Sequence, residues 1–135
     1  MLRILLAFLL IGSVPAAASA QGKSRTGGAD AVLQQWDADH DGTLDLAEAK
    51  KAAAAKFDAL DRDHDGTLDR QELRGVLGAK AMREANTDKD KTIDKNEYAA
   101  LVEKRFKAAD KDNDGTLDKK ELNSSAGRAL LRLLQ

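Results

Sequence analysis

The feature that most constrains the fold of this chain is a twelve-residue acidic segment that occurs four times. The segments span residues 37–48, 61–72, 86–97 and 110–121, so their first residues lie 24, 25 and 24 positions apart. Together they hold 19 of the 23 aspartates and glutamates in the 135-residue chain. Self-similarity at a fixed period indicates a repeated structural unit. We number these segments the first to fourth loop.

The repeat extends beyond the acids to apolar residues at two fixed positions. One is position 8 of each loop, and the other lies four residues before the loop begins. These residues are Leu44, Leu68, Ile93 and Leu117 at position 8, and Leu33, Phe57, Met82 and Phe106 ahead of the loops. The pattern predicts a polar loop between apolar helix positions, repeated four times.

Three loops fit the pattern D-x-[DN]-x-[DN]-G-x₅-E in full and resemble the EF-hand calcium loop. The resemblance covers the chain from about Ala29 to the C-terminus. It implies six to eight oxygen ligands at about 2.3–2.6 Å from a calcium ion. Side chains at positions 1, 3 and 5 supply oxygens, as do the carbonyl at position 7, a water held at position 9 and the Glu at position 12. Glycine at position 6 allows a turn with positive φ.

This resemblance marks positions 1, 3, 5, 7, 9 and 12 of each loop as the candidate calcium ligands. They are Asp37, Asp39, Asp41, Thr43, Asp45 and Glu48 in the first loop, Asp61, Asp63, Asp65, Thr67, Asp69 and Glu72 in the second, Asn86, Asp88, Asp90, Thr92, Asp94 and Glu97 in the third, and Asp110, Asp112, Asp114, Thr116, Asp118 and Glu121 in the fourth.

The third loop departs from the pattern at two positions. Asn86 stands at position 1, where it brings an oxygen but no charge, and Lys91 replaces the glycine at position 6. A lysine in the left-handed conformation costs about 1 kcal/mol, which corresponds to several-fold in affinity. We therefore expect three to four bound Ca²⁺ ions, with the loop 86–97 weakest, or a metal-free third loop kept for pairing.

Two other families of loop are compatible with the acids alone. Calcium loops with the sequence D-x-D-x-D-G occur in other folds, and dockerins use paired loops of related sequence but generally lack the entering helix. Glu at position 12 and the aromatic residues Phe57 and Phe106 favour a helix on each side of the loop. His40 and His64 stand at position 4, which points away from the ion, so we expect them to be surface residues.

The segments between the loops have helical spacing of their apolar residues. They predict an all-α fold, an EF-hand helix-loop-helix array in which four calcium loops are joined by short shared helices. The predicted helices span residues 29–36, 46–60, 70–85, 95–109 and 119–134.

The short spacing between loops restricts how they can pair. Only 12 residues separate Glu48 from Asp61, so one helix must serve as the exit from one loop and the entrance to the next. A straight helix of about 15 residues is roughly 22 Å long and places its two loops at opposite ends. The hypothesis is that loops one and three pair at one end and loops two and four at the other. The alternative is a break at Gly75–Gly78 with pairing of neighbouring loops.

The N-terminus has the layout of a cleavable secretory signal peptide over residues 1–20. Arg3 precedes an apolar run over residues 4–11, and small residues end at Ala20. The run is too short to span a membrane comfortably, so no membrane anchor is expected after cleavage. Residues 21–28 are polar and Gly-rich and read as a flexible leader to the EF-hand domain over 29–135. The expected location is periplasmic or secreted.

Composition excludes several classes of function. The chain has no cysteine, which excludes disulfides, thiolate metal sites and a cysteine nucleophile. Its formal net charge of −1 excludes a strongly basic nucleic-acid binder. No serine–histidine–acid spacing and no Gly-rich phosphate loop is visible, so we expect the protein not to be an enzyme.

Two functions then compete. An exported calcium-ion binder would act as a buffer or calcium-stabilised module, whereas a calcium-dependent sensor would dock on an unknown protein partner through an exposed apolar groove. Sensors favour methionine in such a groove, but beyond residue 20 the chain has only Met82. The sequence also resembles small exported EF-hand proteins of proteobacteria, and this resemblance implies a periplasmic calcium-homeostasis role.

Overall fold

A computed structural model of the chain describes residues 28–135. The predicted signal peptide, 1–20, and leader, 21–28, fall outside this part except for Gly28. The described part is mostly helical, with four two-residue strands. In chain order the elements are α1 (Ala29–Trp36), β1 (Leu44–Asp45), α2 (Leu46–Leu60), β2 (Thr67–Leu68), α3 (Ala79–Ala85), β3 (Ile93–Asp94), α4 (Lys95–Ala109), β4 (Thr116–Leu117), α5 (Lys119–Leu122) and α6 (Ser125–Leu131).

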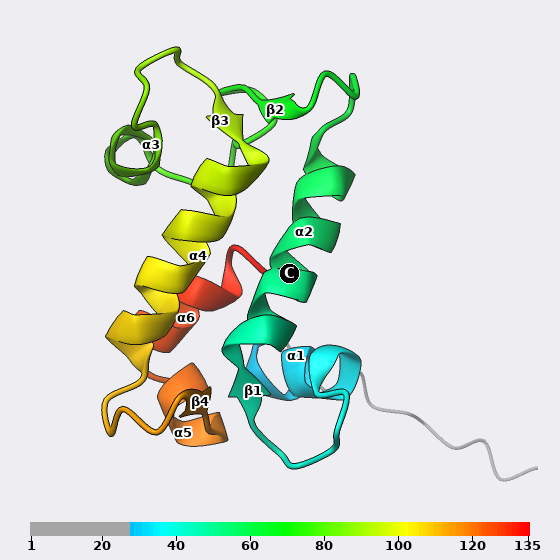
Figure 1. Cartoon of the computed structure of the whole chain (residues 1–135), viewed down its shortest axis with the longest axis vertical. Helices are drawn as coiled ribbons and strands as arrows, with labels where there is room; N and C mark the ends of the chain where they lie inside the picture. The colour runs from blue at the N-terminus through cyan, green and yellow to red at the C-terminus, as the bar shows by residue number, and fades with distance from the viewer. Residues whose placement is uncertain (1–27) are drawn as a thin grey trace, which may run out of the picture.

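Helices α2 and α4 form the centre of the molecule and lie side by side (Figure 1). Each has 15 residues and begins at a capping box, in which the N-cap Asp and the Glu three residues later bond to each other's backbone N–H. The shared helices predicted over residues 46–60 and 95–109 are confirmed, as is the helix over 29–36. Each central helix therefore carries a loop at both ends.

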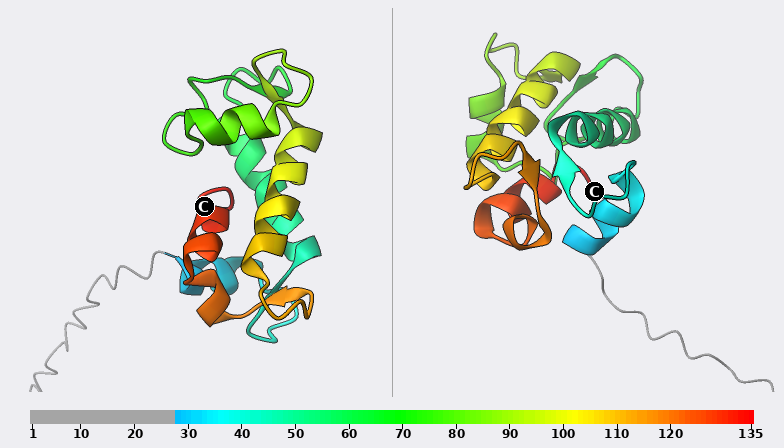
Figure 2. Two further views of the ribbon diagram at one scale, coloured as in Figure 1. Left: turned by 90° about the vertical axis from the view of Figure 1, so that its left-hand side faces the viewer. Right: turned by 60° about the horizontal axis from the view of Figure 1, so that its bottom comes forward.

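The loops pair through short antiparallel strands at the two ends of the central helix pair. At one end β1 pairs with β4, with Leu44 opposite Leu117. At the other end β2 pairs with β3, with Leu68 opposite Ile93. All four of these residues are fully buried. Figure 2 shows in its left-hand view that the two loop pairs occupy opposite ends of the molecule.

The expected pairing of loops one with three and two with four is wrong. Loop one pairs with loop four, and loop two pairs with loop three. The cause is the segment predicted as one helix over 70–85, which forms only a turn after the second loop before α3 begins at Ala79. Gly75 adopts a left-handed conformation with φ 87° and ends that turn. The third loop thus returns to the same end as the second, and α4 runs antiparallel to α2.

The predicted helix over 119–134 is also interrupted. It divides into α5 and α6 because Ser124 adopts an extended conformation and caps α6 by accepting a hydrogen bond from the backbone N–H of Gly127 at 3.0 Å. Helix α6 packs on α4 (Figure 2). At the end of the chain, the side-chain amide of Gln135 donates to the carbonyl of Gly28 at 2.9 Å, so the two ends of the described part meet.

The core consists mostly of leucine and alanine and contains one aromatic pair among the described residues. Phe57 of α2 meets Tyr98 of α4 edge to face, with ring centroids 5.7 Å apart. The buried Tyr98 hydroxyl donates to the carbonyl of Leu133 at 2.9 Å, and burial raises the pKa of Tyr98. This contact ties the C-terminal segment to both central helices.

None of the helices over residues 28–135 has the length and apolar character needed to cross a bilayer.

Gly127 allows the close approach of α6 to α5. A Cβ atom at this position would lie 2.1 Å from the carbonyl oxygen of Glu121 and 2.5 Å from that of Leu122. Both atoms belong to the backbone, so neither can move aside without displacing α5. The turn at Ser124 therefore requires glycine three residues later.

We predict that Gly127→Ala lowers the free energy of unfolding by at least about 2 kcal/mol, because the added carbon overlaps backbone. Urea unfolding of the purified variant measures this. Gly78→Ala is the matched control, since a Cβ at Gly78 would meet nothing within 4 Å and its φ of −77° suits any residue. Its expected loss stays under about 1 kcal/mol. Equal losses in the two variants would contradict the close-approach argument.

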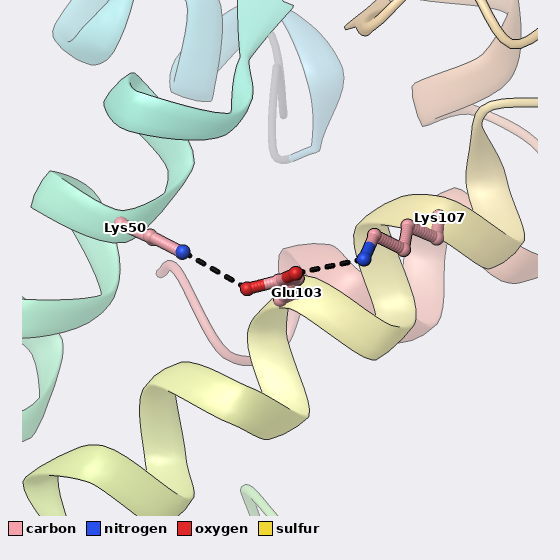
Figure 3. A network of polar contacts seen from close by, with 3 residues as sticks. All are labelled: Lys50, Glu103 and Lys107. Carbon is pink, nitrogen blue, oxygen red and sulfur yellow. Dashed lines mark hydrogen bonds and ion pairs between the residues drawn. The ribbon is translucent and has the colours of Figure 1, made fainter.

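Glu103 of α4 joins the central helices through charge. Its carboxylate accepts from Lys107 Nζ of the same helix at 2.7 Å and from Lys50 Nζ of α2 at 2.9 Å (Figure 3). Hydrogen bonds from Lys107 and Lys50, together with their positive charges, lower the pKa of Glu103 from 4.5 to about 2. Asp58 of α2 and Lys95 of α4 form a second ion pair at 2.8 Å towards the other end.

We predict that Glu103→Gln destabilises the protein at pH 7 and that its difference from wild type shrinks towards zero as the pH falls from about 4.5 to about 2. The folded-state pKa lies below the unfolded one, so the stabilisation is present above the unfolded pKa and is lost as protons bind the folded carboxylate. Urea unfolding of both proteins between pH 7 and about 3, at matched free calcium, tests this. A difference that is independent of pH would contradict the assignment.

Candidate metal centres

Each loop turns through two residues in the left-handed conformation. At position 6 these are Gly42, Gly66, Lys91 and Gly115, with φ between 76° and 88°, and at position 4 they are His40, His64, Lys89 and Asn113, with φ between 57° and 62°. The positive φ at position 6 was predicted from the sequence, whereas the same backbone requirement at position 4 was not. The histidines and the asparagine at position 4 could have indicated it, because His and Asn are enriched in this conformation.

The Glu at position 12 closes each loop onto its start. In the first loop, Glu48 Oε1 accepts from the backbone N–H of Ala38 at 2.7 Å. Its other oxygen, Oε2, accepts from the backbone N–H of Asp45 at 3.0 Å. The same two bonds recur at Glu72, Glu97 and Glu121. One carboxylate therefore holds together both ends of a loop.

The Asp at position 9 caps the segment that follows the loop, which is a helix after Asp45, Asp94 and Asp118 and a turn after Asp69. Asp45 Oδ1 accepts from the backbone N–H of Glu48 at 2.7 Å, and Asp69, Asp94 and Asp118 make the corresponding bonds. The Thr at position 7 binds the Asp at position 5: Thr43, Thr67, Thr92 and Thr116 donate both a hydroxyl and a backbone N–H to Asp41, Asp65, Asp90 and Asp114. These predicted ligand positions thus organise the loop backbone.

The remaining acids of the first, second and fourth loops converge on one point in each loop. Carboxylate oxygens from positions 1, 3 and 12 lie within 4.8 Å of one another in each group. The groups are Asp37, Asp39 and Glu48; Asp61, Asp63 and Glu72; and Asp110, Asp112 and Glu121. The position 1 aspartates Asp37, Asp61 and Asp110 are only 8%, 7% and 9% exposed.

The crowding of these carboxylates perturbs their protonation. Burial raises the pKa of Asp37, but hydrogen bonds led by that from Gly42 outweigh it and hold the pKa below its ordinary value. A hydrogen bond from Asp41 lowers the pKa of Asp39, but burial and the charges of Asp41 and Glu48 prevail and raise it. Asp63 and Asp112 also have raised pKa values because burial and neighbouring charges outweigh a backbone hydrogen bond. Negative charge is thus in excess at these sites.

The donor set of these three loops fits a calcium ion. Hard oxygens are grouped closely enough to share one ion, because calcium–oxygen distances are about 2.3–2.6 Å. The Oδ1 atom of Asp110 is buried and has no hydrogen-bond partner. A buried carboxylate oxygen without a donor needs a positive partner. His40 and His64 are exposed and lie outside the three groups.

The third loop has a different arrangement. Glu97 is buried, at 8% exposed, and accepts from the Thr87 hydroxyl and the Asp88 N–H in addition to the two bonds common to all loops. Hydrogen bonds from the backbone and the hydroxyl of Thr92 lower the pKa of Asp90. Asn86 Oδ1 is buried without a partner. Over residues 28–135, no group of three acidic or histidine ligands forms in this loop.

Comparison with known protein families identifies the repeated unit. A model described as "EF-hand domain" matches residues 53–82, and a model described as "EF hand" matches residues 29–51 and 101–124. The matched segments cover the first, second and fourth loops with adjoining helices. No curated protein matches the chain significantly. The helix-loop-helix geometry and the family matches together show that the chain contains EF-hand domains.

Proposed function

We propose that this protein binds calcium ions and is exported, and that it acts as a calcium buffer or a calcium-stabilised module. The observation that carries the proposal is the convergence of three carboxylates within 4.8 Å in each of three EF-hand loops. In each of these loops, positions 1, 3, 5 and 12 supply side-chain oxygens, position 7 its carbonyl, and position 9 a water-mediated contact. Three to four ions are proposed, with loop 86–97 weakest.

The chemistry that calcium supplies at these sites is neutralisation of charge. The protein residues hold the ligand oxygens at short mutual distances, where like charges a few ångströms apart repel by a few kcal/mol at an effective dielectric near 20. Occupation of all four loops changes the net charge of residues 21–135 from −2 to +6. A site with a dissociation constant of about 1 μM at about 1 mM free calcium adds about 4 kcal/mol to stability. That is comparable with the whole stability of a small domain.

The placement of the apolar side chains favours a buffer or module over a sensor. The C-terminal leucines that could dock on a partner are Leu130, Leu131, Leu133 and Leu134, and all four are buried in the core. Met82 is partly buried against the same core. The EF-hand family generally binds calcium without catalysis, so we propose no enzymatic activity. The sensor with an unknown protein partner is the second candidate.

The export part of the proposal rests on the sequence of residues 1–20. A positive residue, an apolar run and a small-residue cleavage site support cleavage before Gln21 and release into the periplasm or the medium, with a role in calcium homeostasis there. The mass of the protein from the periplasmic and extracellular fractions tests this. A mass that includes residues 1–20, or recovery in the cytoplasmic fraction alone, would refute export.

We predict that Glu48→Gln and Glu121→Gln each remove one bound calcium ion, because each replaces an oxygen of the ligand group by an amide nitrogen. Isothermal titration of chelator-stripped protein with calcium measures the stoichiometry, and Trp36, next to the first loop, reports its occupation by fluorescence. Glu103→Gln is the matched control and should leave the stoichiometry unchanged, since Glu103 lies outside the loops. Absence of binding at millimolar calcium would refute the proposal.

We predict that calcium causes little or no increase in the binding of a dye for exposed apolar surface, because the leucines that could form a docking surface are in the core. The fluorescence of such a dye is measured once with chelator and once with about 1–2 equivalents of calcium per loop. A large calcium-dependent rise would favour the sensor instead.

A further inference from the structure

We propose that the third loop, 86–97, is a permanently closed loop that needs no calcium, so that the molecule has one constitutive end and one calcium-dependent end. The end formed by loops two and three keeps its structure without metal, whereas the end formed by loops one and four requires it. The inference rests on the proposed calcium binding and fixes the stoichiometry at three ions.

Protein donors already occupy the oxygens of Glu97. Its Oε1 atom accepts from the Thr87 N–H at 2.7 Å, the Thr87 hydroxyl at 2.9 Å and the Asp88 N–H at 3.4 Å, and its Oε2 atom accepts from the Asp94 N–H at 3.2 Å. A carboxylate oxygen has two lone pairs, so Oε1 has none left for a metal. In the other three loops, the corresponding Oε1 atom accepts one bond.

The residue at position 2 explains this difference. Thr87 occupies the place held by Ala38, Arg62 and Lys111 in the other loops. Only threonine among these has a hydroxyl that can donate to the Glu at position 12. Hydrogen bonds to an ionised carboxylate stabilise it by about 1.5–3 kcal/mol each. Protein donors therefore occupy Oε1 of the charged Glu97, whereas in the other loops the corresponding Oε1 keeps a lone pair that a cation can use.

Positions 1 and 6 of the third loop also differ from those of the other loops. In the other loops, the N–H of the glycine at position 6 donates to Oδ2 of the Asp at position 1, at 2.9–3.1 Å. In the third loop, Asn86 Oδ1 has no hydrogen-bond partner, so it receives no such bond from the Lys91 N–H. The unpartnered Asn86 Oδ1 is a neutral amide oxygen outside any group of three acids, whereas the unpartnered Asp110 Oδ1 belongs to such a group. A neutral amide oxygen needs no positive charge, because a water molecule can satisfy it.

The pairing of loops turns this local difference into an asymmetry of the whole molecule. Loop two has its own acid group but pairs with a loop that is already closed, through Leu68 and Ile93. Loops one and four each carry an acid group and pair with each other. When metal is absent, the carboxylates within each of these two loops therefore repel one another. Loss of calcium should therefore open the β1–β4 end first, while the β2–β3 end remains paired.

Calcium titration of three single variants tests the stoichiometry. We expect three ions in the wild type, three in Glu97→Gln and two in the matched variant Glu121→Gln. Thr87→Val removes the extra donor while keeping the shape of the side chain, and it replaces Glu97→Gln in the test if that variant fails to fold. We expect Thr87→Val to retain at least three sites. Four ions in the wild type, or loss of one ion in Glu97→Gln, would overturn the inference. No binding by any protein would instead refute the proposed function.

Hydrogen exchange of the backbone amides tests the asymmetry directly. In chelator we expect protection at the β1–β4 pair to fall at least tenfold more than at the β2–β3 pair, and calcium should restore it. Glu97→Gln should reduce the protection of the β2–β3 pair in chelator. Equal loss at both ends, or greater loss at β2–β3, would overturn the inference.

A gain of a site is the complementary experiment. The triple variant Asn86→Asp, Thr87→Ala and Lys91→Gly restores the charge at position 1, frees Glu97 and relaxes the backbone at position 6. It should bind four ions where the wild type binds three. An unchanged stoichiometry in this folded variant would show that Thr87, Asn86 and Lys91 do not account for the closed loop, and would overturn the mechanism proposed for it.

Discussion

The rest of the structure depends on two backbone hydrogen bonds that the glutamate at the end of each loop accepts. One carboxylate accepts from the start of the loop and from the residue that caps the segment after it, as Glu48 does with Ala38 and Asp45, and this segment is a helix after every loop except the second. Closure of the loop and initiation of the helix are therefore one event. The helices that start in this way at the first and third loops are the long central helices α2 and α4. A change in either loop therefore affects a helix that reaches the other end of the molecule. A loop with unneutralised acids weakens its helix as well as itself.

The two central helices explain why four loops can share so small a core. Each central helix begins at one loop and ends at another, which leaves no residues for a separate exiting and entering helix between those two loops. Antiparallel packing brings the loops together in pairs, and each pair buries two apolar residues from its strands. Apart from the edge-to-face contact of Phe57 and Tyr98, most of the core is leucine and alanine. Such a core contributes modest hydrophobic stability, so charge in the loops has a large relative effect.

Much of this fold follows from the sequence because its signals are local. The period of the acidic loops and the apolar spacing place α1, α2 and α4 at their observed bounds. The pairing could not be derived in the same way, because it depends on whether residues 70–85 form one helix or turn back at Gly75. Helix propensity indicates that a helix is weakest at these glycines. It does not compare the cost of a break there with the stability gained when distant strands pair. The break at Ser124 and the donors around Glu97 likewise depend on three-dimensional contacts, although Thr87 itself was visible.

The meeting of the two ends of the described domain has a topological consequence. Because the Gln135 side chain binds the Gly28 carbonyl, a short polar linker could join these ends without crossing the surface. A new terminus could then be opened near Gly78, where the backbone is exposed and a Cβ has free space around it. Such a circular permutant would place loops three and four before loops one and two in the chain while keeping both strand pairs. Sequence order would change, and the spatial partners of each loop would not.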